Sequence, residues 1–143
     1  MLKPNQLKYK DVKVGDAFSF ERQIDEAALA DFSNLSGDHN PIHSDAAYAR
    51  EAGFDGQVAH GMLLGSLFST LIGMLCPGEH GLYLSQTLNF RRPVFAGAKV
   101  KVEGRVLAKS DATQVIELET LIRNERGEVV VEGNAKAKFR KNA

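Results

Sequence analysis

Cysteine is nearly absent from this 143-residue sequence, whose single thiol is Cys76. One cysteine cannot form a disulfide within the chain, and no group of cysteines and histidines has the spacing of zinc ligands. These absences favour a metal-free protein in a reducing compartment, and we expect it in the cytoplasm. Cys76 itself is predicted to be a buried residue at a helix end.

An excess of charge of one sign is also missing. Lysine and arginine together number 18, as do aspartate and glutamate, so the formal net charge is zero. Without net charge there is no overall field that attracts nucleic acid or an anionic membrane, and we expect neither as a partner. An anionic ligand must therefore be bound by local groups.

Hydrophobic runs of membrane-spanning length are lacking too. The longest apolar segment, residues 60–75, has 16 residues and includes serine and threonine, whereas a spanning helix needs about 20. Residues 1–13 are rich in lysine but have no apolar core of a signal peptide. The length suits one domain, residues 1–143, that buries about two thirds of its unfolded surface.

The hydrophobic pattern that is present begins with a strand and two helices. Residues 17–22 alternate as a strand with both phenylalanines on one face. Asp25 is a good N-cap for a helix that Gly37 ends, and Asp45 is a good cap for a short helix through Arg50. The apolar stripe expected on the first helix comprises Leu29, Phe32 and Leu35.

Residues 60–75 are apolar on nearly every side, which predicts a long helix buried in the fold. Small residues recur at every fourth position, so one ridge of this helix has almost no side-chain bulk. Such a ridge allows a close approach by a tightly wrapped sheet, by an acyl chain lying along it, or by both. The residues of the ridge are Gly61, Gly65, Ser69 and Gly73.

From residue 82 onward the hydrophobic period changes to two. Alternating segments at 82–90, 100–106, 116–122 and 129–139 predict four strands with one buried face each, and 124–127 is a turn. One strand, a helical insertion, a long buried helix and four antiparallel strands indicate an α+β fold. In this hot-dog architecture a curved antiparallel sheet wraps around a central helix.

The loop between the two helices of the insertion carries Asp38 and His43, five positions apart. Gly37 tolerates unusual backbone angles, and Pro41 removes a donor and restricts the residue before it, so the loop is stiff. An acid and a base on a stiff loop can converge on one water molecule, as general acid–base catalysis requires. The plainer alternative is that Asp38 caps a turn and His43 lies on a polar surface.

Two motifs carry a resemblance to a known family. Ser36 to His43 reads Ser-Gly-Asp-His-Asn-Pro-Ile-His, with Phe32 before it and Ala46 to Tyr48 after it. It resembles the signature of the MaoC-like, R-specific enoyl-CoA hydratases, also called hydratase 2. Val58 to Met62, Val-Ala-His-Gly-Met, resembles the start of the central helix in the same family. The resemblance implies a single hot-dog fold whose overhanging insertion carries the catalytic loop, and a homodimer.

The resemblance implies addition of water to a trans-2-enoyl-CoA to give a 3R-hydroxyacyl-CoA, and the reverse dehydration. This reaction serves fatty acid or polyhydroxyalkanoate precursor metabolism and needs no metal or redox cofactor.

Seven residues are implied in this chemistry. Asp38 and His43 activate the water, and which of them protonates the α-carbon is left open. Gly61, at a helix N-terminus, offers its N–H to the thioester oxygen, a donor worth about 10²–10³ in rate. Ser69 matches a family serine that hydrogen-bonds the catalytic aspartate, although it lies about 12 Å along the helix from Gly61. The implied substrate-binding residues are Asn40, which orients the loop or the water, His60 and Met62.

Two other functions remain open. A hot-dog thioesterase shares the fold and the helix-end oxyanion site, and a non-catalytic acyl-CoA-binding module keeps the cavity without needing the acid or the base. The carrier, CoA or acyl carrier protein, is also open because both present pantetheine, and the acyl chain is expected to be short to medium. The basic residues that either meet carrier phosphates or form a solvated face are Arg91, Arg92, Lys136, Lys138, Arg140 and Lys141.

Overall fold

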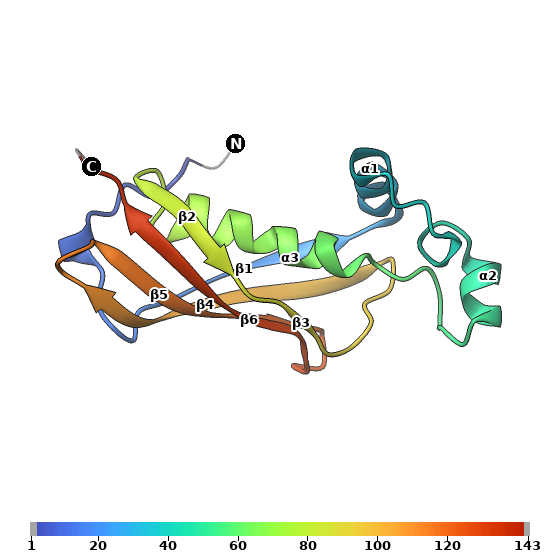
Figure 1. Cartoon of the computed structure of the whole chain (residues 1–143). Coiled ribbons are helices and arrows are strands. Elements are labelled where there is room, and N and C mark those ends of the chain that lie inside the picture. Colours follow the sequence, from blue (N-terminus) through green and yellow to red (C-terminus); the bar gives the residue numbers. More distant parts are fainter. Residues whose placement is uncertain (1–2, 142–143) are drawn as a thin grey trace.

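In the computed structural model, which describes residues 3–141, an antiparallel sheet lies against one long helix (Figure 1). The sheet order is β1-β4-β5-β6-β2, and the short β3 also pairs with β6. This is the predicted hot-dog architecture, except that the strand expected at 82–90 is divided in two. The strands are β1 (Ala17–Ile24), β2 (Gly81–Gln86), β3 (Asn89–Phe90), β4 (Ala98–Ser110), β5 (Val115–Arg123) and β6 (Val129–Phe139).

The central helix α3 (Gly61–Thr70) continues as a π-helical turn, η3 (Leu71–Leu75). Phe68 and Leu71 are fully buried and pack with the inward valines of β4 and β6. Cys76 follows the π turn and is fully buried, as predicted for a residue at a helix end. Within residues 3–141, no helix has the length and apolarity that spanning a membrane requires.

The predicted caps of the insertion are confirmed. The Asp25 carboxylate accepts a hydrogen bond from the Ala28 N–H (2.8 Å) at the start of α1 (Glu26–Ser36), and Gly37 ends that helix with φ of 81°. Asp45 caps α2 (Ala46–Glu51) by accepting from the Tyr48 N–H (3.0 Å). Figure 1 places α1 and α2 together at one end of the molecule, beside the beginning of α3.

Three leucines expected to face the core do not. Leu35 is 85% exposed because α1 lies beyond the end of the sheet, so that only Leu29 of the predicted stripe is fully buried. On β2, Leu82 and Leu84 are about half exposed, whereas Tyr83 between them packs into the core. β2 is an edge strand of the sheet, so the face that carries its leucines has no covering layer within this chain.

The first half of the small-residue ridge on α3 meets the β2–β3 segment. A Cβ atom at Gly61 would lie 3.0 Å from the Phe90 ring, and one at Gly65 would lie 2.9 Å from the Leu88 side chain. The second half is open, since Ser69 is exposed. The close approach of a sheet is therefore confirmed at the beginning of the helix.

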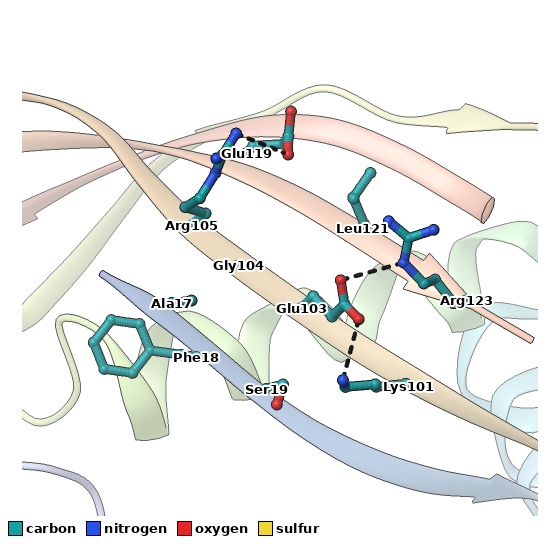
Figure 2. Close-up of a pocket in the computed structure, with 10 residues that line it drawn as sticks. All are labelled: Ala17, Phe18, Ser19, Lys101, Glu103, Gly104, Arg105, Glu119, Leu121 and Arg123. Atoms are coloured by element: carbon teal, nitrogen blue, oxygen red, sulfur yellow. Dashed lines mark hydrogen bonds and ion pairs between the residues drawn. The ribbon is translucent and has the colours of Figure 1, made fainter. Parts of the chain in front are cut away.

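A shallow hollow of about 340 Å³ lies on the face of the sheet that points away from α3 (Figure 2). Its charged side chains neutralise one another: Glu103 pairs with Arg123 (3.3 Å) and Lys101 (3.4 Å), and Arg105 with Glu119 (3.7 Å). Exposed pairs of this kind contribute little stability. The hollow is a solvated sheet face, distant in the chain from the Asp38 loop.

Candidate active site

The loop after α1 is stiffened by two successive side-chain turns. Asp38 Oδ1 accepts from the Asn40 N–H (3.1 Å), and Asn40 Oδ1 accepts from the Ile42 N–H (3.2 Å). The second turn begins a short 3-10 helix, η2 (Pro41–His43), that the sequence did not predict. Asp38 thus caps a turn, as the plainer alternative held, but only Oδ1 is used, and its side chain remains half exposed.

His43 is buried, contrary to the alternative that placed it on a polar surface. Its Nδ1 lies 2.6 Å from the carbonyl oxygen of Val58. A carbonyl only accepts, so Nδ1 carries the proton, and in the neutral ring Nε2 has a free lone pair. The backbone before α3 therefore fixes both the tautomer and the direction of this imidazole.

The free atoms of the acid and the base face each other. Asp38 Oδ2 and His43 Nε2 are 3.6 Å apart, which is too long for a direct hydrogen bond. One water molecule can contact both atoms across such a gap at ordinary hydrogen-bond distances. The loop thus brings the two free atoms close enough for the convergence on one water that the sequence motif predicts, and that convergence stays a prediction.

An apolar cavity of about 320 Å³ opens beside His43, whereas Asp38 is not among the residues that line it. His43 and Gly61 both line it. Gly61 is the first residue of α3, and the first N–H groups of a helix have no intrahelical partner. The cavity therefore offers a base and a helix-end donor to the same ligand. Its apolar lining includes Ile42, Leu64, Phe90, Val94 and Val131.

Three of the predicted site residues lie elsewhere. Ser69 is exposed and does not line the cavity. Met62 is 58% exposed on the outer side of the start of α3. His60 is only 2% exposed, and its ring contacts other parts of the chain. The ring is covered, and the role of His60 in substrate binding stays a prediction.

Asp38, His43 and His60 come close enough to raise the question of a metal, since one ligand atom of each lies within 4.8 Å of the others. The two imidazoles are stacked, with centroids 3.7 Å apart and planes 19° apart. A ligating histidine directs an in-plane lone pair at a metal about 2.0 Å away, and two stacked rings cannot both do so to one ion. These residues do not fit a metal site.

Two of the six basic residues considered for carrier phosphates form ion pairs. Arg91 forms an ion pair with Glu132, and Arg92 pairs with Glu128 (3.3 Å). Both arginines nevertheless line the cavity that His43 and Gly61 share. They are the members of the predicted basic set that lie near the site.

Two contributors to the site were not predicted. Ser33, on α1, is 6% exposed and lies 3.0 Å from His60 Nε2, and the Val58 carbonyl holds His43. A signal for Ser33 existed, because it follows Leu29 by one helical turn and so occupies a core position with a polar side chain. The Val58 contact is made by the backbone carbonyl, so the side-chain type at this position could not have indicated it.

In this hot-dog domain a carboxylate lies 3.6 Å from an imidazole, and the imidazole shares an apolar cavity with a helix N-terminus, which is the architecture of an acyl-thioester hydro-lyase. The chain belongs to the MaoC-like family, since residues 11–127 match the MaoC like domain. The expected family is thereby confirmed.

Individual relatives agree with this assignment. The (R)-specific enoyl-CoA hydratase of Aeromonas caviae is 38% identical over 130 residues, 91% of this chain and 97% of the relative. The unliganded R-hydratase PhaJ1 of Pseudomonas aeruginosa superposes with a TM-score of 0.89 at 40% identity, over 94% of this chain and 86% of that one. A mitochondrial 3-hydroxyacyl-[acyl-carrier-protein] dehydratase of Arabidopsis thaliana is 33% identical, over 88% of this chain and 76% of the relative.

Proposed function

We propose that this protein is an R-specific enoyl-CoA hydratase, which adds water reversibly to trans-2-enoyl-CoA to give 3R-hydroxyacyl-CoA. The observation that carries the proposal is the 3.6 Å gap between Asp38 Oδ2 and His43 Nε2, together with the apolar cavity that His43 lines. Both atoms are free of other partners in the described chain, and both can accept a proton. A water molecule held between them is poised for addition to a double bond.

In the forward reaction the water oxygen bonds to the β-carbon of the enoyl group. One O–H bond of the water breaks, and its proton passes to the Asp38–His43 pair. The π electrons move toward the thioester carbonyl, and a proton from the pair then bonds to the α-carbon. The pair ends with the protons it began with, so neither an oxidant nor a reductant is consumed, and we propose that no cofactor takes part.

Gly61 supports the charge that develops during this step. The thioester oxygen becomes enolate-like as the π electrons move, and the N–H of Gly61, the first residue of α3 and part of the cavity lining, donates to it in this mechanism. The partial positive charge of the helix N-terminus acts in the same direction. Because enolate character is larger in the transition state than in the substrate, this donor accelerates addition.

The cavity favours short to medium acyl chains. Its volume of about 320 Å³ is at the lower end for small-molecule sites, which range from about 300 to 1,000 Å³. CoA is the proposed carrier, and an acyl carrier protein is the alternative. The buried free thiol of Cys76 suits a reducing compartment, and on that basis we place the enzyme in the cytoplasm.

We also propose that the protein is a homodimer. Four large apolar side chains at the β2–β3 edge and the adjoining start of α3 are about half exposed, which is unusual for one contiguous region of a monomer. A second copy paired along the β2 edge would continue the sheet and cover these side chains. They are Met62, Leu82, Leu84 and Phe90.

The reaction is tested with crotonyl-CoA. Hydration removes the absorbance of the conjugated enoyl thioester without releasing a thiol, and the product should be the 3R enantiomer by chiral chromatography. A thiol reagent in a parallel assay detects free CoA. Release of CoA in step with the absorbance loss would instead identify a thioesterase, and tight binding without any turnover would identify a non-catalytic module.

A further inference from the structure

His60 contacts both members of the catalytic pair without reaching the cavity. Its ring stacks on the His43 ring with centroids 3.7 Å apart, and it also packs against Phe32, centroids 4.8 Å apart and tilted by 56°. The ring is 2% exposed. His60 therefore sets the plane in which the His43 ring lies.

The polar edge of His60 is directed at the catalytic loop. Its Nε2 lies 3.3 Å from the backbone oxygen of Asp38 and 3.0 Å from the hydroxyl of Ser33. A carbonyl oxygen only accepts, so the contact with Asp38 requires that Nε2 carry the proton. The Ser33 oxygen then accepts from the same N–H, which ties the loop to α1.

The other neutral tautomer of His60, with the proton on Nδ1, is less favourable. It would place the Nε2 lone pair against the Asp38 carbonyl and leave a buried N–H on Nδ1, which has no hydrogen-bond partner within residues 3–141. An orphaned buried donor is costlier than an unpaired acceptor. The Nε2–H tautomer leaves only a lone pair unpaired and satisfies the carbonyl.

We infer that His60 and Ser33 form a positioning pair, which holds the Asp38 backbone and the His43 ring so that the reactive atoms Oδ2 and Nε2 keep the separation that accommodates one water. Neither residue touches the substrate. The inference rests on the proposed hydratase function and adds to it two residues that act through others.

The electrostatics of the stack agree with this arrangement. Burial lowers the pKa of His60, and the nearby His43 and His39 act in the same direction, while the Asp38 carbonyl and carboxylate oppose them. His60 thus stays neutral while His43 exchanges protons with the water. A second cation stacked on a protonated His43 would be unfavourable.

The test uses Ser33→Ala, His60→Phe and Ser33→Thr in the full-length protein. Ser33→Ala removes one acceptor, and His60→Phe keeps an aromatic ring for stacking but removes the donor. We expect kcat for crotonyl-CoA to fall about 3–10-fold in Ser33→Ala and about 10²-fold in His60→Phe, with KM within about twofold, because misplacement of a catalytic group by about 1 Å costs that much. Ser33→Thr restores the hydroxyl and should recover activity relative to Ser33→Ala.

A loss of folded protein would also lower kcat, so a second readout is required. Loosening Asp38 from His43 should lower kcat per folded molecule with KM within about twofold, and Ser33→Thr should recover that kcat. A merely structural role would lower activity only in proportion to the folded fraction. Ser19→Ala, on the outer face of β1, is the matched control and should behave as wild type.

Several outcomes would overturn the inference. Wild-type kcat in folded Ser33→Ala would do so, as would activity losses that only follow the folded fraction. If His60→Phe fails to fold, Ser33→Ala and Ser33→Thr decide the matter. Absence of hydration by the wild-type protein would instead refute the proposed function, so the two failures are distinguishable.

Discussion

Replacing Asp38 by Asn and His43 by Gln, singly and together, tests whether the two residues act on one water. In Asp38→Asn the side-chain oxygen can still accept from the Asn40 N–H, now 3.1 Å from Oδ1, but the second oxygen becomes an amide group without basicity. In His43→Gln the amide can still donate to the Val58 carbonyl, while the titratable Nε2 is lost. Each change removes one free atom of the pair and keeps its anchor.

The expected losses follow from the geometry. A positioned acid or base supplies about 10²–10⁴ in rate, so each single variant should lose about 10²-fold or more in kcat, which is about 3 kcal/mol. In the proposed mechanism the two atoms, 3.6 Å apart, act on the same water. Once one substitution has removed the rate acceleration of the pair, the second substitution has little further effect on kcat. The double variant should therefore lose much less than the product of the single losses.

Stability separates catalysis from folding in this series. Asp38 is half exposed, so Asp38→Asn should leave the melting temperature nearly unchanged. His43 is buried and stacked, so His43→Gln should cost about 1–2 kcal/mol of unfolding free energy. Crotonyl-CoA hydration, product affinity and melting temperature are measured for all four proteins. Near wild-type turnover in Asp38→Asn would refute the mechanism, and fully multiplicative losses would mean that the residues act in separate steps.

Three further predictions concern close packing and the exposed edge. Gly61→Ala places a Cβ 3.0 Å from the Phe90 ring at the cavity, and the displaced ring should lower kcat/KM about 10-fold at little cost in melting temperature, measured by steady-state kinetics with calorimetry. Gly104→Ala places a Cβ 2.6 Å from the fully buried Leu71, and chemical denaturation should show a loss of about 1–3 kcal/mol with normal activity per folded molecule. Leu84→Lys puts a charge on the β2 face, and light scattering should show a change from about twice 15.6 kDa to a monomer; a wild-type protein that is already monomeric at micromolar concentration would refute the dimer.

The sequence predicted the helix ends of the insertion correctly, because a cap depends on residues only a few positions away. Asp25 and Asp45 cap their helices, and Gly37 takes the left-handed conformation that ends α1, because each contact is made within a few residues. The acid and the base were likewise found from one short loop. What these signals did not reveal is which atoms of Asp38 and His43 remain free.

Alternation predicted the strands but not their inward faces. Leu82 and Leu84 alternate with Tyr83, and hydrophobicity alone favours the leucines for the core, yet Tyr83 occupies it. Both faces of this edge strand carry large apolar side chains, so alternation alone does not tell which face is inward. The same holds for the outer side of α3, where Met62 is exposed.

The 3.6 Å gap depends on contacts that the loop itself does not make. An acid and a base five residues apart on one loop would otherwise close into a direct hydrogen bond and leave no place for water. Here each is anchored through an atom that does not react: His43 by Nδ1 on the Val58 carbonyl, and Asp38 by its own carbonyl on His60. Both anchors come from the segment that starts α3. In the proposed mechanism the Val-Ala-His-Gly-Met motif therefore has a second role besides presenting the Gly61 N–H to the thioester, because its Val58 and His60 also anchor the base and the acid. This explains in physical terms why the loop motif alone does not make the site.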